Sequence, residues 1–191
     1  MSKDTAQRIL DTALHLIVQR GYHGFSYADI AEVVMVKKPS IHFHFPTKAE
    51  LVRQLLVQYR ETVRSNLERL SVAVPDPLAQ LRAYAGYWEE CIRDDRSPFC
   101  LCALLASELL SLPPEVAEEV KLHFRDLAGW LAATLEQGAA RGVLALPRGA
   151  QAEAESFMAS VHGAMLSARV YGDAEVFAGV MGDAIGRLRI R

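Results

Sequence analysis

The sequence predicts an all-α protein, on three observations. Apolar residues recur every three or four positions along most of the chain, which is the period of an amphipathic helix. Residues that start helices, and glycines or prolines that end them, punctuate these stretches. No stretch shows the alternation expected of a strand, and no repeat or low-complexity tract stands out. We expect about nine helices, in an N-terminal three-helix domain (residues 1–47) and a C-terminal helical bundle (residues 48–191).

Length and composition are those of a soluble globular protein. The chain has 191 residues, of which 51% are hydrophobic, so it can bury a substantial core. Its longest uncharged run, residues 97–107, is too short to cross a bilayer, and its first residues lack the apolar stretch of a signal peptide. Three cysteines, an odd number, fit a reducing compartment. We therefore expect a cytoplasmic protein with no membrane segment.

Charge is distributed unevenly along the chain. Residues 1–70 carry 10 Lys and Arg against 7 Asp and Glu, a net charge of +3. The remainder carries 11 against 16, a net charge of −5. Four of the six histidines also fall in the first part. This mild basic bias fits an N-terminal domain that faces a polyanion, although alone it decides nothing.

Residues 5–20 and 26–45 predict a helix followed by a helix-turn-helix. The first helix has a periodic apolar face and ends at Gly21; that face consists of Ile9, Leu10, Ala13, Leu16 and Ile17. Ser26 can cap the second helix, with Asp29 as the other half of a capping box. Pro39 is tolerated only in the first turn of the third helix, which therefore starts near Lys37 or Lys38. Its buried face is Val36 and Ile41, which pack against Ile30, Ala31 and Val34.

This stretch resembles the DNA-binding segment of the TetR family of bacterial repressors. The resemblance covers roughly the first third of the chain in fixed register. It rests on Ile9, Leu10, Ala13, Gly21, Tyr22, Phe25, Ser26, Asp29, Ile30, Ala31, Val36, Lys38, Ser40, Ile41, Phe43, His44, Phe45, Lys48 and Leu51. Two residues depart from the family pattern. Met35 stands where a glycine is usual, at a cost on the order of 1 kcal/mol if that position needs a positive φ, and Pro39 replaces a glycine or alanine.

The resemblance implies which side chains would contact double-stranded operator DNA. Those expected at base edges are Lys38, Pro39, Ser40, His42 and Phe43, and those expected at phosphates are Tyr27, His44 and Lys48. Lys37 could contact either bases or phosphates, and Ser26, the cap of the second helix, is the remaining candidate DNA-binding residue. Phe45 is expected in the core. His42 and His44 point to different sides of a helix, so we expect no metal site there.

The rest of the chain predicts six further helices. Thr47 and Glu50 form a capping box that starts a connector helix over residues 48–70. The next helix begins at Pro77 behind its cap Asp76, and another begins after Ser97 and Pro98 and runs to about Leu110. The last three are expected over residues 115–137, 151–171 and 174–188. This layout is similar in pattern to the ligand-binding and dimerisation domain of the TetR family.

That second resemblance suggests an effector site within the bundle. Small neighbours surround an aromatic and methionine set, which is also what an ordinary core would show. The candidate ligand-binding residues are Tyr84, Trp88, Cys91, Cys100, Leu105, Glu108, Phe124, Trp130, Met158 and His162. Cys100 is expected in the first turn of its helix, where the helix dipole favours thiolate, so it could sense electrophiles. The three cysteines could equally be small buried hydrophobes.

The last two helices are expected to form a homodimer. They carry small residues that permit close helix approach and more apolar surface than one subunit would hide. The candidate interface residues are Ala159, Gly163, Ser167, Phe177, Val180, Met181 and Ala184.

The sequence as a whole indicates a TetR-type transcriptional regulator, a repressor rather than an enzyme. It would bind a palindromic operator as a homodimer and respond to a small effector or to thiol modification, with no cofactor and no metal. Two alternatives stay open. One is a thiol enzyme with Cys100 as nucleophile and His123 or His162 as base. The other is a DNA-binding protein without an effector.

Overall fold

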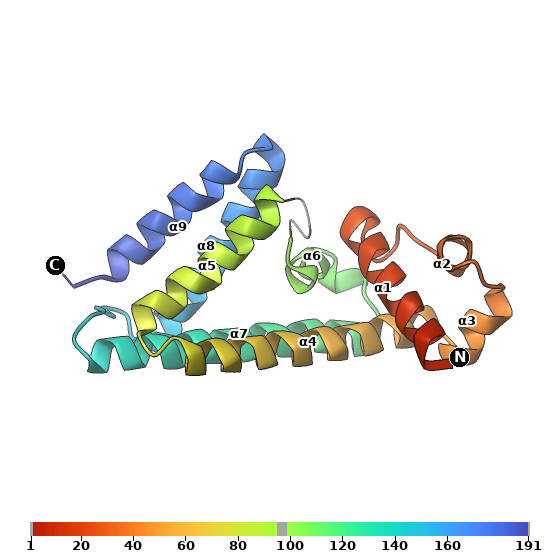
Figure 1. Cartoon of the computed structure of the whole chain (residues 1–191), viewed down its shortest axis with the longest axis horizontal. Coiled ribbons are helices and arrows are strands. Elements are labelled where there is room, and N and C mark those ends of the chain that lie inside the picture. The colour runs from red at the N-terminus through yellow and green to blue at the C-terminus, as the bar shows by residue number, and fades with distance from the viewer. Residues whose placement is uncertain (1, 95–98, 191) are drawn as a thin grey trace. The chain divides into compact units, whose positions relative to one another are not determined.

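The computed structural model describes residues 2–94 and 99–190, and over these it is helical (Figure 1). The helices in order are α1 (Ser2–Arg20), α2 (Tyr27–Val34), α3 (Lys38–His44), α4 (Lys48–Ala73), α5 (Pro77–Arg93), α6 (Leu101–Ala106), the 3-10 helix η1 (Leu109–Ser111), α7 (Pro114–Ala140), α8 (Ala150–Tyr171) and α9 (Ala174–Leu188). One isolated antiparallel bridge joins Leu144 to Arg189. The predicted all-α class is confirmed. No described helix is both long and apolar enough to cross a membrane.

The chain forms two compact units. The N-terminal unit contains residues 1–62 and 101–123, and the C-terminal unit contains residues 63–100 and 124–191. This division differs from the predicted boundary at residue 47. The reason is that the first part of α4, α6 and the first part of α7 pack with the three N-terminal helices. Helices α4 and α7 each run through both units.

The helix-turn-helix forms as its sequence predicts. Ser26 caps α2, and Asp29 closes the capping box by accepting hydrogen bonds from the Ser26 N–H and Oγ, both at 2.7 Å. Met35 ends α2 in the left-handed conformation with φ 59°, so this methionine carries the strain that a glycine would avoid. Lys37 is the N-cap of α3, and Pro39 lies in its first turn, where no N–H is needed.

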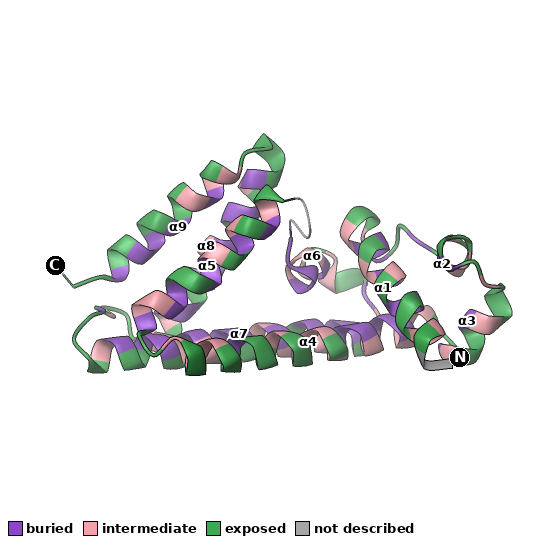
Figure 2. Cartoon of the chain, viewed as in Figure 1, coloured by how far each residue is buried: buried purple, intermediate pink, exposed green. Residues whose placement is uncertain are grey.

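The C-terminal unit is built on α5, α8 and α9, which pack against one another. Asp76 caps α5 by accepting the Ala79 N–H at 3.0 Å, and Asp173 caps α9 by accepting the Glu175 N–H at 2.9 Å. Gly138 is required where α7 meets the following loop, because an added Cβ would lie 2.3 Å from Leu144 Cδ1. Each of α5, α8 and α9 has buried residues along one side and exposed residues along the other (Figure 2).

Helix α6 is shorter than predicted. It begins at Leu101 and ends at Ala106, and the predicted start at Ser97 and Pro98 lies outside the described residues. Its end is set by i→i+3 bonds from the Ser107 and Glu108 N–H groups, which tighten the chain toward η1 instead of continuing the α-helix. Cys100 therefore lies directly before the first residue of α6 and not within its first turn.

Candidate functional site

The outward face of α3 is the first candidate site. Lys37, Lys38, Pro39, His42 and Phe43 are exposed, with Phe43 82% accessible, while Ser40 and His44 are half-buried. On the opposite face Ile41 is completely buried, and Phe45 follows it into the core as predicted. An exposed phenylalanine beside cationic and imidazole side chains gives this face both apolar and hydrogen-bonding groups.

Tyr27 and His42 hold this face in position. The Tyr27 hydroxyl donates to the Phe45 carbonyl at 2.9 Å, and the Tyr27 and His42 rings meet edge to face with centroids 4.8 Å apart. His42 Nδ1 lies 3.2 Å from the Pro46 carbonyl. Burial, with a smaller effect from Tyr22, raises the pKa of Tyr27 to about 12, so this phenol stays neutral. Tyr27 thus joins the start of α2 to the end of α3.

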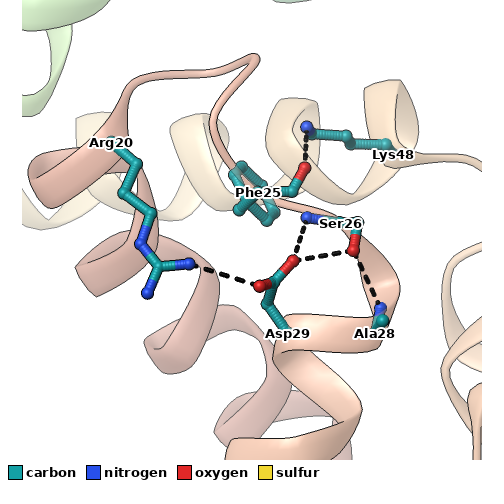
Figure 3. Close-up of polar contacts among 6 residues, drawn as sticks. All are labelled: Arg20, Phe25, Ser26, Ala28, Asp29 and Lys48. Carbon is teal, nitrogen blue, oxygen red and sulfur yellow. Dashed lines mark hydrogen bonds and ion pairs between the residues drawn. The ribbon is translucent and has the colours of Figure 1, made fainter.

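Lys48 points into the N-terminal unit. Its ammonium donates to the Phe25 carbonyl (Figure 3). It also lies 4.0 Å from the Phe25 ring centroid and 4.8 Å from that of Tyr22. Burial lowers the pKa of Lys48, and Asp29 and Glu108 oppose that effect. The resemblance implied that Lys48 reaches a phosphate. In this structure the Phe25 carbonyl and the Phe25 and Tyr22 rings hold its ammonium instead.

Ser26 is likewise engaged locally. Its Oγ donates to Asp29 and accepts the Ala28 N–H at 3.2 Å, and Arg20 pairs with the other Asp29 oxygen at 3.2 Å (Figure 3). The Ser26 side-chain bond is the largest of the effects that lower the pKa of Asp29. Ser26 and Lys48 therefore fix how α2 begins.

Glu108, predicted as a ligand anchor, belongs to the N-terminal unit and makes a local contact there. Its Oε1 accepts the Tyr22 N–H at 3.0 Å, which ties the end of the α6 segment to the turn between α1 and α2. Nearby, His23 Nε2 lies 3.2 Å from Ser111 Oγ. Gly21 has φ 74°, and a Cβ there would lie 2.4 Å from Glu108 Oε1. We call the contact among Gly21, Tyr22 and Glu108 the Glu108 latch. A partner 86 positions away left no local signal in the sequence.

The predicted ligand residues are divided between the two units. Leu105 lies in the N-terminal unit with Glu108 and is completely buried, so it is core there. The other eight lie in the C-terminal unit. Of these, the buried ones are Tyr84, Trp88, Cys91, Cys100 and Met158, and the half-buried ones are Phe124, Trp130 and His162.

Two aromatic contacts join four of these eight residues in pairs. The Tyr84 and Trp130 rings lie with centroids 5.6 Å apart, and the Phe124 and His162 rings lie 5.3 Å apart. Burial raises the pKa of the Tyr84 hydroxyl, and the neighbouring Cys100 thiol acts in the same direction. Cys91, Cys100 and Cys102 are all buried and free of disulfides. Tyr84 therefore brings α5, α7 and the Cys100 thiol together in one buried cluster.

The predicted dimer residues on α8 and α9 fall into two sets. Ala159, Gly163 and Val180 are exposed, and Ser167 is half-buried. Phe177, Met181 and Ala184 are buried within the subunit itself, with at most 5% of the residue accessible, so they offer little surface to a partner. The exposed apolar residues that sequence reasoning missed on the same helices are Leu166, Val170 and Tyr171. A surface groove of about 380 Å³ also lies between α8 and α9, with Arg148, Glu153 and Arg187 among its lining residues.

Comparison with known proteins gives two family-model matches. The model described as "Bacterial regulatory proteins, tetR family" matches residues 9–55. The model described as "Tetracyclin repressor-like, C-terminal domain" matches residues 77–182. The two matched segments contain the helix-turn-helix and most of the C-terminal bundle.

Solved structures and curated relatives agree with these matches. A TetR-family transcriptional regulator from Agrobacterium tumefaciens is 50% identical over 100% of both chains, with a TM-score of 0.97. A TetR transcriptional regulator from Legionella pneumophila is 26% identical over 95% of this chain and 96% of that one, with a TM-score of 0.86. The regulator TtgR of Pseudomonas putida is 36% identical over 83 residues, which are 42% of this chain and 39% of TtgR. The alignment thus spans about two fifths of that curated relative.

Proposed function

The chain belongs to the TetR family of bacterial regulatory proteins, and on that premise we propose that it represses transcription as a homodimer bound to a palindromic operator. A small effector in the C-terminal bundle would release it. The single observation that carries the DNA-binding part is the outward face of α3, where Lys38, His42 and Phe43 are exposed opposite a completely buried Ile41. A helix held in this way can enter the major groove.

The chemistry of this face suits base readout. Lys38 and His42 can offer hydrogen-bond donors to purine acceptors in the major groove, and Phe43 and Pro39 can meet thymine methyl groups. Ser40, half-buried on the same helix, can donate or accept. In this proposal Tyr27 and Lys48 act mainly by fixing the orientation of α2 and α3, since both polar groups are held by backbone carbonyls.

Replacing Phe43 by alanine should change which operator sequences are preferred. Phe43 is exposed, so the fold should be unaffected, and loss of a base contact costs about 1–3 kcal/mol of discrimination. The measurement is selection of bound duplexes from random DNA, followed by titration of the selected site and its single-base variants. Val33→Ala, at an exposed position of α2, is the control. An unchanged base preference for Phe43→Ala would remove this residue from the interface.

The proposed homodimer rests on an exposed apolar stripe of α8. Ala159, Gly163, Leu166 and Val170 are spaced by four, three and four residues, so they share one face of the helix. Leu166 is 55% and Val170 is 72% accessible in the subunit. A two-fold axis through this stripe would pair the two subunits and set their α3 helices about 34–36 Å apart, or a multiple of that distance.

Replacing Leu166 by glutamate should dissociate the dimer. A carboxylate buried without a partner at the interface is strongly unfavourable, whereas in a separated subunit it meets water. Sedimentation velocity at micromolar concentration should show a dimer for the wild type and a monomer for the variant, together with weaker operator binding. Val72→Glu introduces the same charge at an exposed valine of α4 and should remain dimeric. A dimeric Leu166→Glu variant would place the interface elsewhere.

We propose a reversible ligand in preference to thiol modification. Cys100 lies directly before α6 and still adjoins the N-terminus of that helix, so the reason for this preference is burial. The residue is only 1% accessible, which hinders attack by a reagent from solvent. Treating the DNA-bound protein with a small electrophile should therefore leave the operator bound. Release by the electrophile in wild type but not in Cys100→Ser would restore the sensing role.

A further inference from the structure

The surface groove between α8 and α9 has no part in the DNA-binding proposal. Its volume is about 380 Å³, at the lower end of the volumes that hold small ligands. The lining residues come from the loop before α8, from α8 and from α9. All three segments belong to the C-terminal unit, so the groove lies within one compact part of the chain.

The groove has an apolar floor. Phe157 of α8 and Ala184 and Leu188 of α9 line it and are almost completely buried. Ala184 is small, and so are Ser156 and Ser160 on the α8 side, so the two helices pack without filling the space between them. The apolar part of a ligand laid on this floor would be removed from water, which favours binding.

The groove carries one uncompensated positive charge. Glu153 is bound at both oxygens by Arg148, at 3.0 and 2.8 Å. These bonds lower the pKa of Glu153, so the pair stays ionised and its charges cancel. Arg187 also lines the groove, is exposed and makes no ion pair with any described residue, Asp183 one turn earlier included. The groove therefore offers one guanidinium to a ligand and no carboxylate.

Ser156 adds a hydrogen-bond donor to the groove. The Ser160 hydroxyl donates to the Ser156 carbonyl at 2.9 Å, so its hydrogen is already used. Ser156 itself is exposed, and its hydroxyl makes no hydrogen bond to any residue that the structure describes. A planar guanidinium and a hydroxyl are both good donors to a carboxylate.

The groove lies beside the apolar stripe of α8 that is proposed for the dimer. With about 3.6 residues per turn, Glu153, Ser156 and Ser160 are centred about a quarter of a turn away from the stripe that contains Leu166 and Val170. A dimer paired through that stripe can therefore leave one groove open on each subunit.

We propose that this groove binds a small monocarboxylate with an apolar body. Arg187 pairs with the carboxylate, and Ser156 donates a hydrogen bond to it. The apolar body lies on Phe157, Ala184 and Leu188. A cation would meet Arg187 with no free carboxylate opposite, a neutral compound would lack the ion pair, and a dianion would leave one charge unmatched. The site is separate from the proposed effector site within the bundle, and it does not depend on the proposed repressor function.

Four probes test this ligand class. 2-Naphthoate is an aromatic monoanion, 2-naphthamide is its neutral counterpart, 2-naphthyl phosphate is a dianion in mildly alkaline buffer, and acetate is a carboxylate without the apolar body. Isothermal titration calorimetry on the full-length protein measures their binding at low salt. 2-Naphthoate should bind about tenfold more tightly than each of the other three. Arg187→Gln should lose the preference over 2-naphthamide. Arg189→Gln, which removes an exposed arginine outside the groove, should keep it.

Other outcomes would overturn the proposal. Equal binding of 2-naphthoate and 2-naphthamide would reject the ion pair, and equal binding of acetate would reject the apolar floor. Tighter binding of 2-naphthyl phosphate would contradict the single charge. An unchanged preference in Arg187→Gln would place the carboxylate outside the groove, and no binding of 2-naphthoate at millimolar concentration would reject the site. Binding of 2-naphthoate by Leu166→Glu but not by the wild type would assign the groove to the contact between subunits.

Discussion

Replacing Lys48 by methionine is expected to lower the free energy of unfolding by about 1–3 kcal/mol. Methionine keeps most of the aliphatic stem but removes the ammonium that donates to the Phe25 carbonyl and lies over the Tyr22 and Phe25 rings. Removing a half-buried cation also relieves its desolvation, which is why the expected loss stays below the sum of the separate contacts. Denaturant unfolding measures the change.

The same variant should bind all DNA sequences more weakly, with no change in base preference. Lys48 orients the start of α2 and is not part of the exposed face of α3, so its loss disturbs the position of the whole reading helix. Titrations with the selected operator and its single-base variants should show a uniform drop. Lys37→Met removes an exposed cation and is the matched control for stability. Wild-type stability in Lys48→Met would refute the buried role, and a changed base preference would assign Lys48 to base readout.

Local chemistry explains which features the sequence predicted well. The Ser26 cap, the Pro39 first turn and the Asp76 cap each depend on residues within four positions of one another, so short-range geometry determines them. The strained turn at Met35 was also visible, because a family pattern with glycine implies a positive φ at that position. All four belong to backbone conformations that a few consecutive residues can specify.

Features that depend on distant partners were not predictable. Glu108 has a charge and a helical position that suit a ligand anchor equally well, and only the fold brings the Tyr22 N–H to it. On α9, apolar residues occur on more than one side, so periodicity could not tell that Phe177 faces its own subunit while Val180 stays exposed. The end of α6 was misjudged because Ser107 and Glu108 take i→i+3 bonds in a sequence that would also tolerate an α-helix.

Replacing Glu108 by alanine is expected to cost about 1–3 kcal/mol of stability and to weaken operator binding. The Tyr22 N–H loses its acceptor, and the turn that leads from α1 into α2 is no longer held to the segment after α6. Glu108→Gln keeps an amide oxygen at the same place, so it should retain most of the stability. If Gln and Ala behave alike, the hydrogen bond to Tyr22 does not stabilise the turn.

Gly21 provides the complementary test of the Glu108 latch. Gly21→Ala should destabilise the protein by about 2–4 kcal/mol, through a left-handed backbone that alanine resists and through the lost latch bond. The second part arises because the new Cβ would lie 2.4 Å from Glu108 Oε1 and would displace the carboxylate from Tyr22.

The double variant Gly21→Ala, Glu108→Ala separates the two parts. The Glu108 side chain is already absent in it, so the change at Gly21 should add only its backbone strain to the loss from Glu108→Ala. The double variant should therefore be more stable than the two single losses predict, by about 1 kcal/mol or more. Strict additivity in denaturant unfolding would mean that residue 21 and Glu108 act independently, and the latch would then have no energetic basis.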